Sequence, residues 1–295
     1  MTTSDQTLAA RLLSERPELV EVAERTSAYG ELASALRAVT LSIDGHTYVV
    51  AEGDLLLDRD ELRLYALRRA AARDAGVPDP APSVPLEPTE ALTGISVGGT
   101  VVRWADPTSL HYCVFEASFP THEQYDAVRD NMAAATADWE ATCGVRSRHL
   151  AEHDGAEPST PLSDLDPGLV FAVRFVDAQG QFLASAFFPT SPPERRRLLI
   201  DPSYFEPGLR FDLVGILRHE LGHVLGFRHE HIRSGAPPQC PDEDSADTVD
   251  LTQYDPRSVM HYFCGGVGTP ELEITDLDRQ GAQQLYGPPL GAEGV

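Results

Sequence analysis

The feature that most constrains this chain is a histidine-rich stretch at residues 218–230, Arg-His-Glu-Leu-Gly-His-Val-Leu-Gly-Phe-Arg-His-Glu. Two residues that are four apart in an α-helix project from one face, one turn apart. His219 and His223 can therefore bind one metal ion. Glu220 lies beside that face, where it can reach a water molecule on the metal without being a ligand.

The same stretch supplies a third ligand. Gly226 accepts positive φ, so the backbone can leave the helix and return His229 to the metal as a third imidazole. Average residue usage would produce the whole pattern in a chain of this length with a probability on the order of one in 10⁵, whereas a lone histidine on a helix is usually packed or exposed. We therefore predict one catalytic Zn²⁺ with three protein ligands and a fourth position open to water.

The pattern HExxHxxGxxH resembles that of the metzincin zinc endopeptidases, which also have a methionine-bearing turn beneath the metal. The run Ser-Val-Met-His-Tyr at 258–262 fits that turn, and Gly-Phe-x-His-Glu at 226–230 resembles specifically the astacin family. The resemblance implies that Met260 is an apolar floor, that Tyr262 is an extra, movable zinc ligand, and that Glu230 anchors the mature N-terminus. The alternatives are that Met260 and Tyr262 are core side chains and that Glu230 is a solvated carboxylate.

Length and charge limit the classes of protein. With 295 residues, the chain fits a catalytic domain of about 200 residues plus an accessory segment. Its 46 acidic and 23 basic residues give a net charge of -23, so we expect no binding to nucleic acid or to an anionic membrane.

Neither a membrane span nor an export signal is expected. No apolar run approaches the length of about 18 residues that a span needs, and residues 1–17 lack the basic start and apolar core of a signal peptide. Residence inside the cell, export by another system and a missing leader stay open, although the family resemblance implies secretion.

The four cysteines show no CxxC spacing and allow three pairings. We expect disulfides between Cys113 and Cys143 and between Cys240 and Cys264. Four buried free thiols are the alternative.

Residues 1–76 are predicted to form a mainly helical, pro-like segment with a β-hairpin. Helical patterns cover residues 4–38 and 60–75, and residues 39–50 form the hairpin with a two-residue turn. A proline-rich linker at 77–93 follows. Three arginines in the second helical pattern offer sites for an activating protease or simply solvate a helix face, namely Arg68, Arg69 and Arg73.

The hairpin leads into Ala51-Glu52-Gly53-Asp54, which resembles the F-x-G-D motif of astacin pro-segments, with Ala51 in place of phenylalanine. The resemblance implies that Asp54 ligates zinc in a latent enzyme and displaces its water. Two alternatives stay open: the tetrad is an ordinary turn, or the N-terminal segment is a folding aid or an unrelated helical domain.

Residues 94–295 are predicted to form an α+β catalytic domain. The resemblance implies a twisted mixed β-sheet, the zinc-binding helix, the methionine turn and a C-terminal helix. Helices are expected after three capping residues, which are Thr121, Asp212 and Thr275. Strands are expected near residues 100–104, 112–115, 145, 169–176, 182–188 and 198–201.

Two segments of this domain resemble the matrixins, a sister family. The segment 183–189 resembles the strand at their cleft, and 281–287 resembles their closing helix. Pro189 suits a sheet edge, which could pair with an extended substrate by β-augmentation; an ordinary edge is the alternative. The candidate substrate-binding residues are Ala184, Ser185, Ala186 and Phe187.

The acidic stretch 240–255 is a candidate Ca²⁺ loop, although its spacing is not that of an EF-hand and a solvated loop is the alternative. Its acidic residues are Asp242, Glu243, Asp244, Asp247 and Asp250.

The sequence thus predicts a monomeric zinc endopeptidase that is made as a latent zymogen and acts on proteins or peptides. Zinc would lower the pKa of its water to about 7, Glu220 would transfer the proton to the leaving amine, and Tyr262 would help zinc to stabilise the oxyanion. One alternative is a catalytically silent metal-binding protein that holds a partner. Another is a zinc hydrolase with a substrate other than a peptide.

Overall fold

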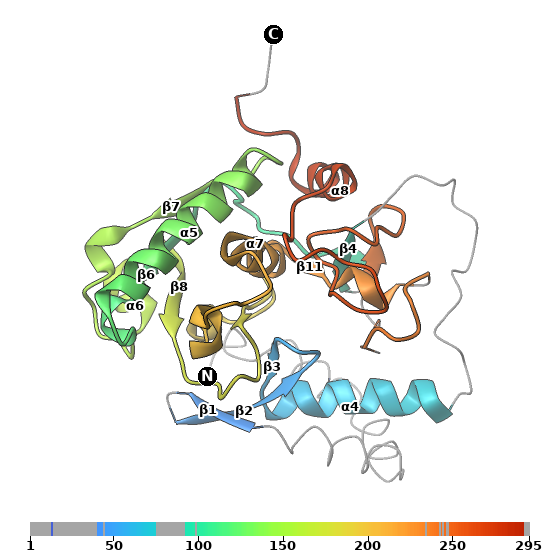
Figure 1. The fold of residues 1–295 in the computed structure, drawn as a ribbon, viewed down its shortest axis with the longest axis horizontal. Coiled ribbons are helices and arrows are strands. Elements are labelled where there is room, and N and C mark those ends of the chain that lie inside the picture. Colours follow the sequence, from blue (N-terminus) through green and yellow to red (C-terminus); the bar gives the residue numbers. More distant parts are fainter. Residues whose placement is uncertain are drawn as a thin grey trace.

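The computed structural model describes residues 13, 40–43, 45–74, 92–97, 99–233, 235–241, 243, 245 and 248–291. These residues form the predicted α+β architecture, with three β-sheets and helices α4 to α8 (Figure 1). Nearly all of the helical pattern at 4–38, most of the linker at 77–93 and the side chains of Arg68, Arg69 and Arg73 lie outside the described residues. Within them, no helix combines the length and the apolar character needed to cross a membrane.

The described part of the N-terminal segment is a three-stranded sheet followed by a helix. Strands β1 (Thr40–Ile43) and β2 (His46–Ala51) pair antiparallel, with Ile43 opposite His46, which confirms the hairpin. Strand β3 (Leu55–Leu57) pairs with β2 and was not predicted. Helix α4 (Arg59–Asp74) confirms the second helical pattern, and Asp58 caps it by accepting two backbone N–H groups of its first turn.

The central sheet has five strands in the order β7-β6-β8-β10-β9. Four strands are parallel, and β9 runs antiparallel to β10 at the edge, which makes the sheet mixed as predicted. The strands are β6 (Leu110–Val114), β7 (Ser147–His149), β8 (Leu169–Phe175), β9 (Ala184–Ser185) and β10 (Arg197–Ile200).

Edge strand β9 is shorter than the predicted 182–188. The chain leaves the ladder after Ser185, because Phe187 turns into the core. Its ring lies 5.6 Å from that of Phe171 and 6.5 Å from that of Trp104, between centroids.

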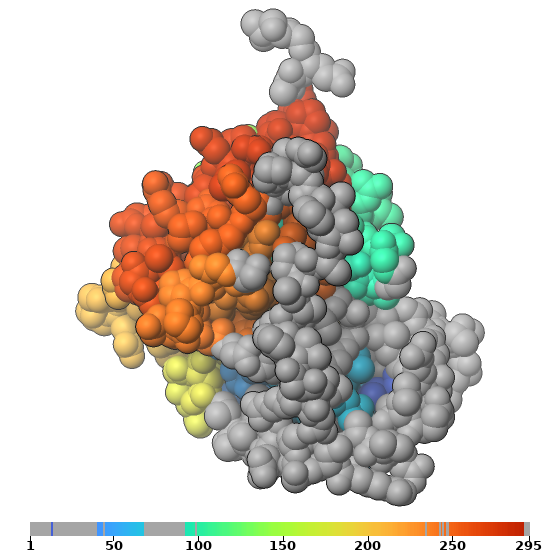
Figure 2. Space-filling view, turned by 90° about the vertical axis from the view of Figure 1, so that its right-hand side faces the viewer, coloured from blue at the N-terminus to red at the C-terminus, as the bar shows by residue number. Residues whose placement is uncertain are grey.

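A second sheet has four strands and lies beside the end of α7. Strand β4 is central, with β11 and β12 on its two sides, and β5 also pairs with β4. The strands are β4 (Thr93–Val97), β5 (Thr100–Val101), β11 (Phe227–Arg228) and β12 (Thr248–Asp250). Figure 2 shows teal residues of the chain that begins at about residue 92 on the same face as the orange residues that follow α7. Thr93, which the sequence assigned to the linker, is therefore the first residue of a buried strand.

The main core lies between the central sheet and two long helices, α5 (His122–Glu140) and α7 (Leu213–Val224). Trp139 of α5 joins them, because its indole N–H donates to the Arg218 carbonyl at 2.9 Å. The short helix α6 (Leu162–Leu165) lies beside β8, and α8 (Asp276–Tyr286) closes the domain. The predicted caps of α5, α7 and α8 are confirmed, since the side chains of Thr121, Asp212 and Thr275 each accept a backbone N–H.

One predicted disulfide is confirmed and the other is wrong. Cys240 and Cys264 are bonded, whereas Cys113 and Cys143 are free and buried. Cys113 packs with Phe115 on one side of the central sheet, and Cys143 belongs to the main core, so the two thiols lie in separate hydrophobic clusters. Burial raises the pKa of each free thiol to about 12.

Candidate metal centre and active site

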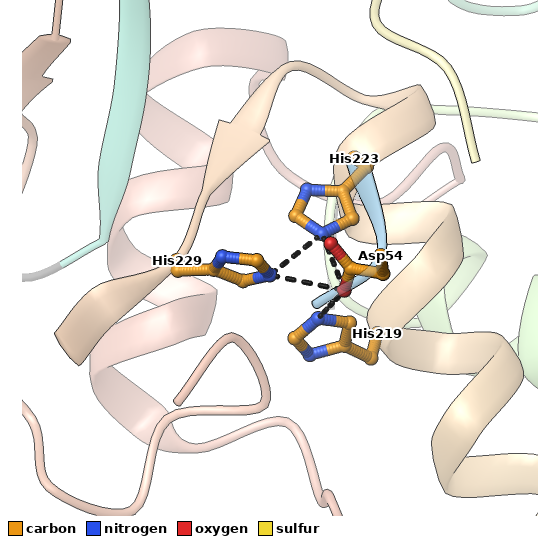
Figure 3. Close-up of side chains that lie close together, drawn as sticks. All are labelled: Asp54, His219, His223 and His229. Carbon is orange, nitrogen blue, oxygen red and sulfur yellow. Dashed lines mark hydrogen bonds and ion pairs between the residues drawn. The ribbon is translucent and has the colours of Figure 1, made fainter. Parts of the chain in front are cut away.

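Three imidazoles converge at the end of α7 (Figure 3). His219 and His223 project from one face of the helix, and His229 follows strand β11. The turn between them depends on Gly226, which has φ of 96°; a Cβ there would lie 3.1 Å from the Val102 carbonyl oxygen. All three rings are buried, and the Nε2 atoms of His223 and His229 are 3.2 Å apart.

The outer nitrogen of each ring is held by an acceptor. His219 Nδ1 lies 2.8 Å from the Val259 carbonyl, and His223 Nδ1 lies 2.8 Å from the Phe227 carbonyl. A carbonyl can only accept, so in these two rings Nδ1 carries the proton and Nε2 presents a lone pair. His229 Nδ1 faces a carboxylate instead, at 2.8 Å from Glu243 Oε2.

Asp54 of the N-terminal segment lies at the centre of the three rings. Its Oδ2 atom is 3.1 Å from His229 Nε2, 3.4 Å from His219 Nε2 and 3.7 Å from His223 Nε2 (Figure 3). Burial favours its neutral form, but the charge of His229 and the hydrogen bond to its ring hold the pKa of Asp54 well below its usual value. The structure therefore brings the carboxylate from the predicted switch tetrad to the predicted metal position.

The rest of the tetrad covers Tyr262. The Tyr262 hydroxyl donates to the Glu52 carbonyl at 2.7 Å, and the Glu52 carboxylate accepts from Arg228 at 2.7 Å. Gly53 has φ of +84°, and a Cβ on it would lie 2.6 Å from the Tyr262 hydroxyl oxygen. Burial, followed by the charge of Asp54, raises the pKa of Tyr262 well above its usual value, so the hydroxyl stays protonated.

Glu220 is buried next to the same centre. Its Oε2 has no hydrogen-bond partner, while the Ala186 backbone N–H donates to the carboxylate. Burial and the negative charge of Asp54 raise its pKa well above the usual value. The carboxylate faces a cavity of about 290 Å³, which has an apolar wall formed by Phe182, Leu183, Phe211, Ile216 and Leu272.

The turn at residues 258–262 lies under helix α7. Met260 is fully buried, and its sulfur packs so closely on Gly222 of α7 that a Cβ at Gly222 would collide with it. The turn also carries the Val259 carbonyl that orients His219. Met260 thus supports α7 from below and makes no polar contact with the centre through its side chain.

Glu230 is not a solvated carboxylate. It is fully buried, and it accepts from Arg233 at 2.8 Å, from the Asp255 N–H at 3.0 Å and from the Thr93 hydroxyl at 3.1 Å. Burial raises its pKa to about 7. Thr93 was not predicted to belong to this network, because the sequence assigned it to the linker.

The edge residues divide into two groups. Ala184 and Ser185 form β9 at the edge of the central sheet, whereas Ala186 and Phe187 follow the strand. Ala186 contacts Glu220 through its backbone, and Phe187 packs in the core.

Glu243 differs from both interpretations of the acidic stretch. Its side chain is buried between two imidazoles, with its oxygens 2.8 Å from His229 Nδ1 and 2.8 Å from His231 Nε2. The charge of His229 outweighs burial and lowers the pKa of Glu243 to about 2. Asp250 is exposed and pairs with Arg233 at 3.1 Å, while Asp242, Asp244 and Asp247 lie outside the described residues.

The donor set fits zinc. The candidate ligand atoms of Asp54 and the three histidines all lie within 4.8 Å of one another, and His219 Nε2 is buried without a hydrogen-bond partner. Converging imidazole lone pairs together with one carboxylate oxygen are typical of a four-coordinate zinc site.

Comparison with known proteins finds a distant similarity to a matrix metalloproteinase. The chain is 28% identical over 140 residues to matrix metalloproteinase-16 of Rattus norvegicus, Homo sapiens and Mus musculus. The match covers 43% of this chain and spans 19% of the length of each relative. No family model matches the chain. The similarity is to a metalloproteinase and supports a protease at a coarse level.

Proposed function

We propose that this protein is a zinc-dependent endopeptidase whose N-terminal segment holds it latent. The observation that carries the proposal is the convergence of three oriented imidazoles on one point beside the buried Glu220 carboxylate, within a chain distantly similar to matrix metalloproteinase-16. His219, His223 and His229 would hold the metal. The apolar cavity beside Glu220 would take part of a peptide substrate.

The chemistry divides between metal and protein. Bound zinc would lower the pKa of a water molecule to about 7 and polarise the substrate carbonyl. Glu220 takes a proton from the attacking water and delivers it to the leaving amine, for which its raised pKa suits it. Tyr262, protonated and adjacent to the rings of His219 and His229, donates a hydrogen bond to the oxyanion once Glu52 has left its hydroxyl.

The position of the N-terminal segment supports latency. Asp54 Oδ2 lies 3.1 Å from His229 Nε2, where it would replace the water of a bound zinc ion, and the Glu52 carbonyl accepts a hydrogen bond from the Tyr262 hydroxyl. One turn therefore blocks the fourth metal position and the oxyanion donor together. A carboxylate that is covalently attached acts at high effective concentration, so even a weak ligand can outcompete water and substrate.

We also propose a subtype of zinc endopeptidase and a division of the chain into pro-segment, linker and catalytic domain. The motif at 226–230, the Tyr262 position and the Asp54 tetrad favour an astacin-like subtype. Residues 1–76 act as a pro-segment, with the linker ending before β4 and the catalytic domain following it. A protease that cuts in the linker would activate a secreted, monomeric enzyme, and Glu230 beside Thr93 would receive the new N-terminus.

Two alternatives from other classes share the same metal centre. A silent metal-binding protein would bind zinc and a partner without turnover, and the intact Glu220 argues against it. A zinc hydrolase with another substrate would cleave ester or amide compounds but not peptides. The apolar cavity beside the buried edge of β9 favours an extended peptide.

The test is digestion of a denatured protein library by the zinc-loaded Asp54→Ala chain, with cleavage sites determined by mass spectrometry. The matched control is Asp54→Ala with Glu220→Gln, which should keep zinc and lose about 10²- to 10⁴-fold in peptide hydrolysis, because an amide cannot transfer the proton. Hydrolysis by the control at about the rate of its parent would contradict the role of Glu220. Zinc binding without cleavage of any peptide would favour the silent binding protein.

A further inference from the structure

The third histidine differs from the other two in how the fold orients it. His219 and His223 are fixed by helix α7 and donate to backbone carbonyls. His229 lies in extended backbone, with φ of −60° and ψ of 136°. Its ring therefore needs another partner to hold it toward the metal, and that partner is the Glu243 carboxylate at 2.8 Å.

Glu243 is itself held on its other side. Oε1 lies 2.8 Å from His231 Nε2, and the His231 ring stacks against both His229 and Tyr262, with centroid distances of 5.1 Å and 4.6 Å. The carboxylate thus sits at the junction of the third ligand and the proposed oxyanion donor. Its side chain is about 1% exposed.

The disulfide explains how a loop residue can be placed so closely. Glu243 lies 14 residues after His229 in the chain, and the described residues between Ile232 and Thr248 belong to no helix or strand. The bond between Cys240 and Cys264 ties this segment to the chain that follows Tyr262. Cys240, shortly before Glu243 in the chain, is therefore joined covalently to Cys264, shortly after Tyr262.

From this geometry we infer that Glu243 is a positioning residue of the metal centre, which fixes the His229 ring through Nδ1 and raises the affinity of the centre for zinc. A negatively charged acceptor makes a stronger hydrogen bond than a carbonyl and increases the basicity of the imidazole. The inference rests on the proposed zinc site. It assigns to the acidic stretch a role other than calcium binding or solvation.

A second metal ion is the competing use of these side chains, because the candidate ligand atoms of His229, His231 and Glu243 also lie within 4.8 Å of one another. Both oxygens of the Glu243 carboxylate already face His229 Nδ1, at 3.0 Å and 2.8 Å, which are distances of a charge-assisted hydrogen bond. We therefore expect one zinc per chain.

The experiment measures zinc affinity of the full chain by competition with a chromophoric chelator. Glu243→Gln keeps the shape and removes the charge, and we expect it to raise the Kd for zinc by about 10- to 100-fold with one site per chain. His219→Ala serves as the reference for loss of a ligand. Glu157→Gln, the same change at an exposed residue, should leave the Kd unchanged.

Two further measurements separate positioning from folding. Cobalt substitution should show altered visible bands in Glu243→Gln, because the third imidazole is reoriented. Thermal unfolding of the chelator-treated proteins tests whether the variant is folded. If Glu243→Gln does not fold, Glu243→Asp decides, since it keeps the charge but withdraws it by one methylene and should raise the Kd by a smaller factor.

The outcomes are distinct. A Kd for Glu243→Gln within about threefold of wild type, well short of the change expected for such a partner, would overturn the inference and leave the zinc site standing. Two zinc ions in the wild type and one in the variant would overturn it in favour of a second metal. No zinc in the wild type would overturn the proposed function together with the inference.

Discussion

At the scale of single residues, Gly53 contributes to covering the three-histidine centre, as does the neighbouring Asp54 carboxylate. Gly53 has φ of +84° and touches the Tyr262 hydroxyl, with no room for a Cβ. This close approach lets Glu52 accept from Tyr262 while Asp54 reaches the imidazoles. The backbone of this turn therefore covers Tyr262, while the Asp54 carboxylate that the turn carries covers the three imidazoles.

Gly53→Ala should release activity although Asp54 is unchanged. Positive φ costs an L-residue about 1–2 kcal/mol, and the added methyl group collides with Tyr262, so the turn should withdraw and peptide hydrolysis by the zinc-loaded full chain should rise about tenfold or more. Initial rates on a quenched fluorescent peptide measure this. Gly45→Ala is the matched control, because Gly45 has φ of +78° but open space around its Cβ position. Equal rates of hydrolysis for Gly53→Ala and Gly45→Ala would rule out the proposed role of Gly53 in holding the turn against Tyr262.

The sequence predicted the residues whose spacing follows from helix geometry. His219, His223 and Glu220 share one helix, so four-residue spacing alone places them. Asp54 was predicted through resemblance, since no local rule connects it with residues about 170 positions later. Glu243 was missed because a loop has no periodicity from which its direction can be inferred. The available signal was a glutamate inside the loop closed by the Cys240–Cys264 pair.

At the scale of elements, the methionine turn and helix α8 form one unit joined by Asp278. Its Oδ2 accepts from the Val259 N–H and the Thr275 N–H, each at 2.9 Å, and its Oδ1 accepts from the Ser258 hydroxyl at 2.6 Å. Asp278 is fully buried. Because Val259 also orients His219, the start of α8 supports the metal centre.

Asp278→Ala should lower the free energy of unfolding by about 2–4 kcal/mol, because it leaves two buried N–H groups and a hydroxyl without an acceptor. Asp278→Asn is the matched change: its oxygen can accept the two N–H groups, and its amide can donate to Ser258. Urea unfolding at neutral pH compares the two variants. A similar loss in both would show that charge, rather than hydrogen bonding, is what the position requires.

The same residue gives a pH dependence. Burial raises the pKa of Asp278 in the folded chain to about 6, from a usual value of 3.8. The folded chain then binds more protons than the unfolded chain between these values, so this residue makes stability fall as pH rises from about 4 to about 6. In Asp278→Asn that contribution should vanish, and the stability profile of wild type minus variant should fall through this window. A flat difference profile would contradict the raised pKa.

The sequence predicted helix starts, which depend on neighbouring residues, better than strands and disulfides, which depend on residues far apart in the chain. The caps at Thr121, Asp212 and Thr275 were predictable because a capping side chain bonds within its own first turn. Strands β3, β4, β11 and β12 were missed, and β9 was predicted too long, because strand pairing depends on partners far along the chain. The Cys113–Cys143 pairing failed for the same reason.

At the scale of the whole molecule, the N-terminal segment is bound to the catalytic part by more than the tetrad. Arg195 contacts Asp58 at 2.6 Å and Glu61 at 2.7 Å, at the start of α4. Tyr48 and neighbouring residues of β1 and β2 form one hydrophobic cluster with Phe182 and others from the catalytic part. These contacts keep the tetrad close to the three imidazoles, and the proposed latency depends on this closeness, because an attached carboxylate acts at a high effective concentration.

The most direct test of latent zinc proteolysis is the rate of peptide hydrolysis by the full chain before and after Asp54→Ala, at equal zinc content verified by elemental analysis. We predict a rate increase of about 100-fold or more without any cleavage of the chain, because water regains the fourth position on the metal. A zinc chelator should abolish the increase. Equal rates for the wild type and Asp54→Ala, at equal zinc content, would contradict the account.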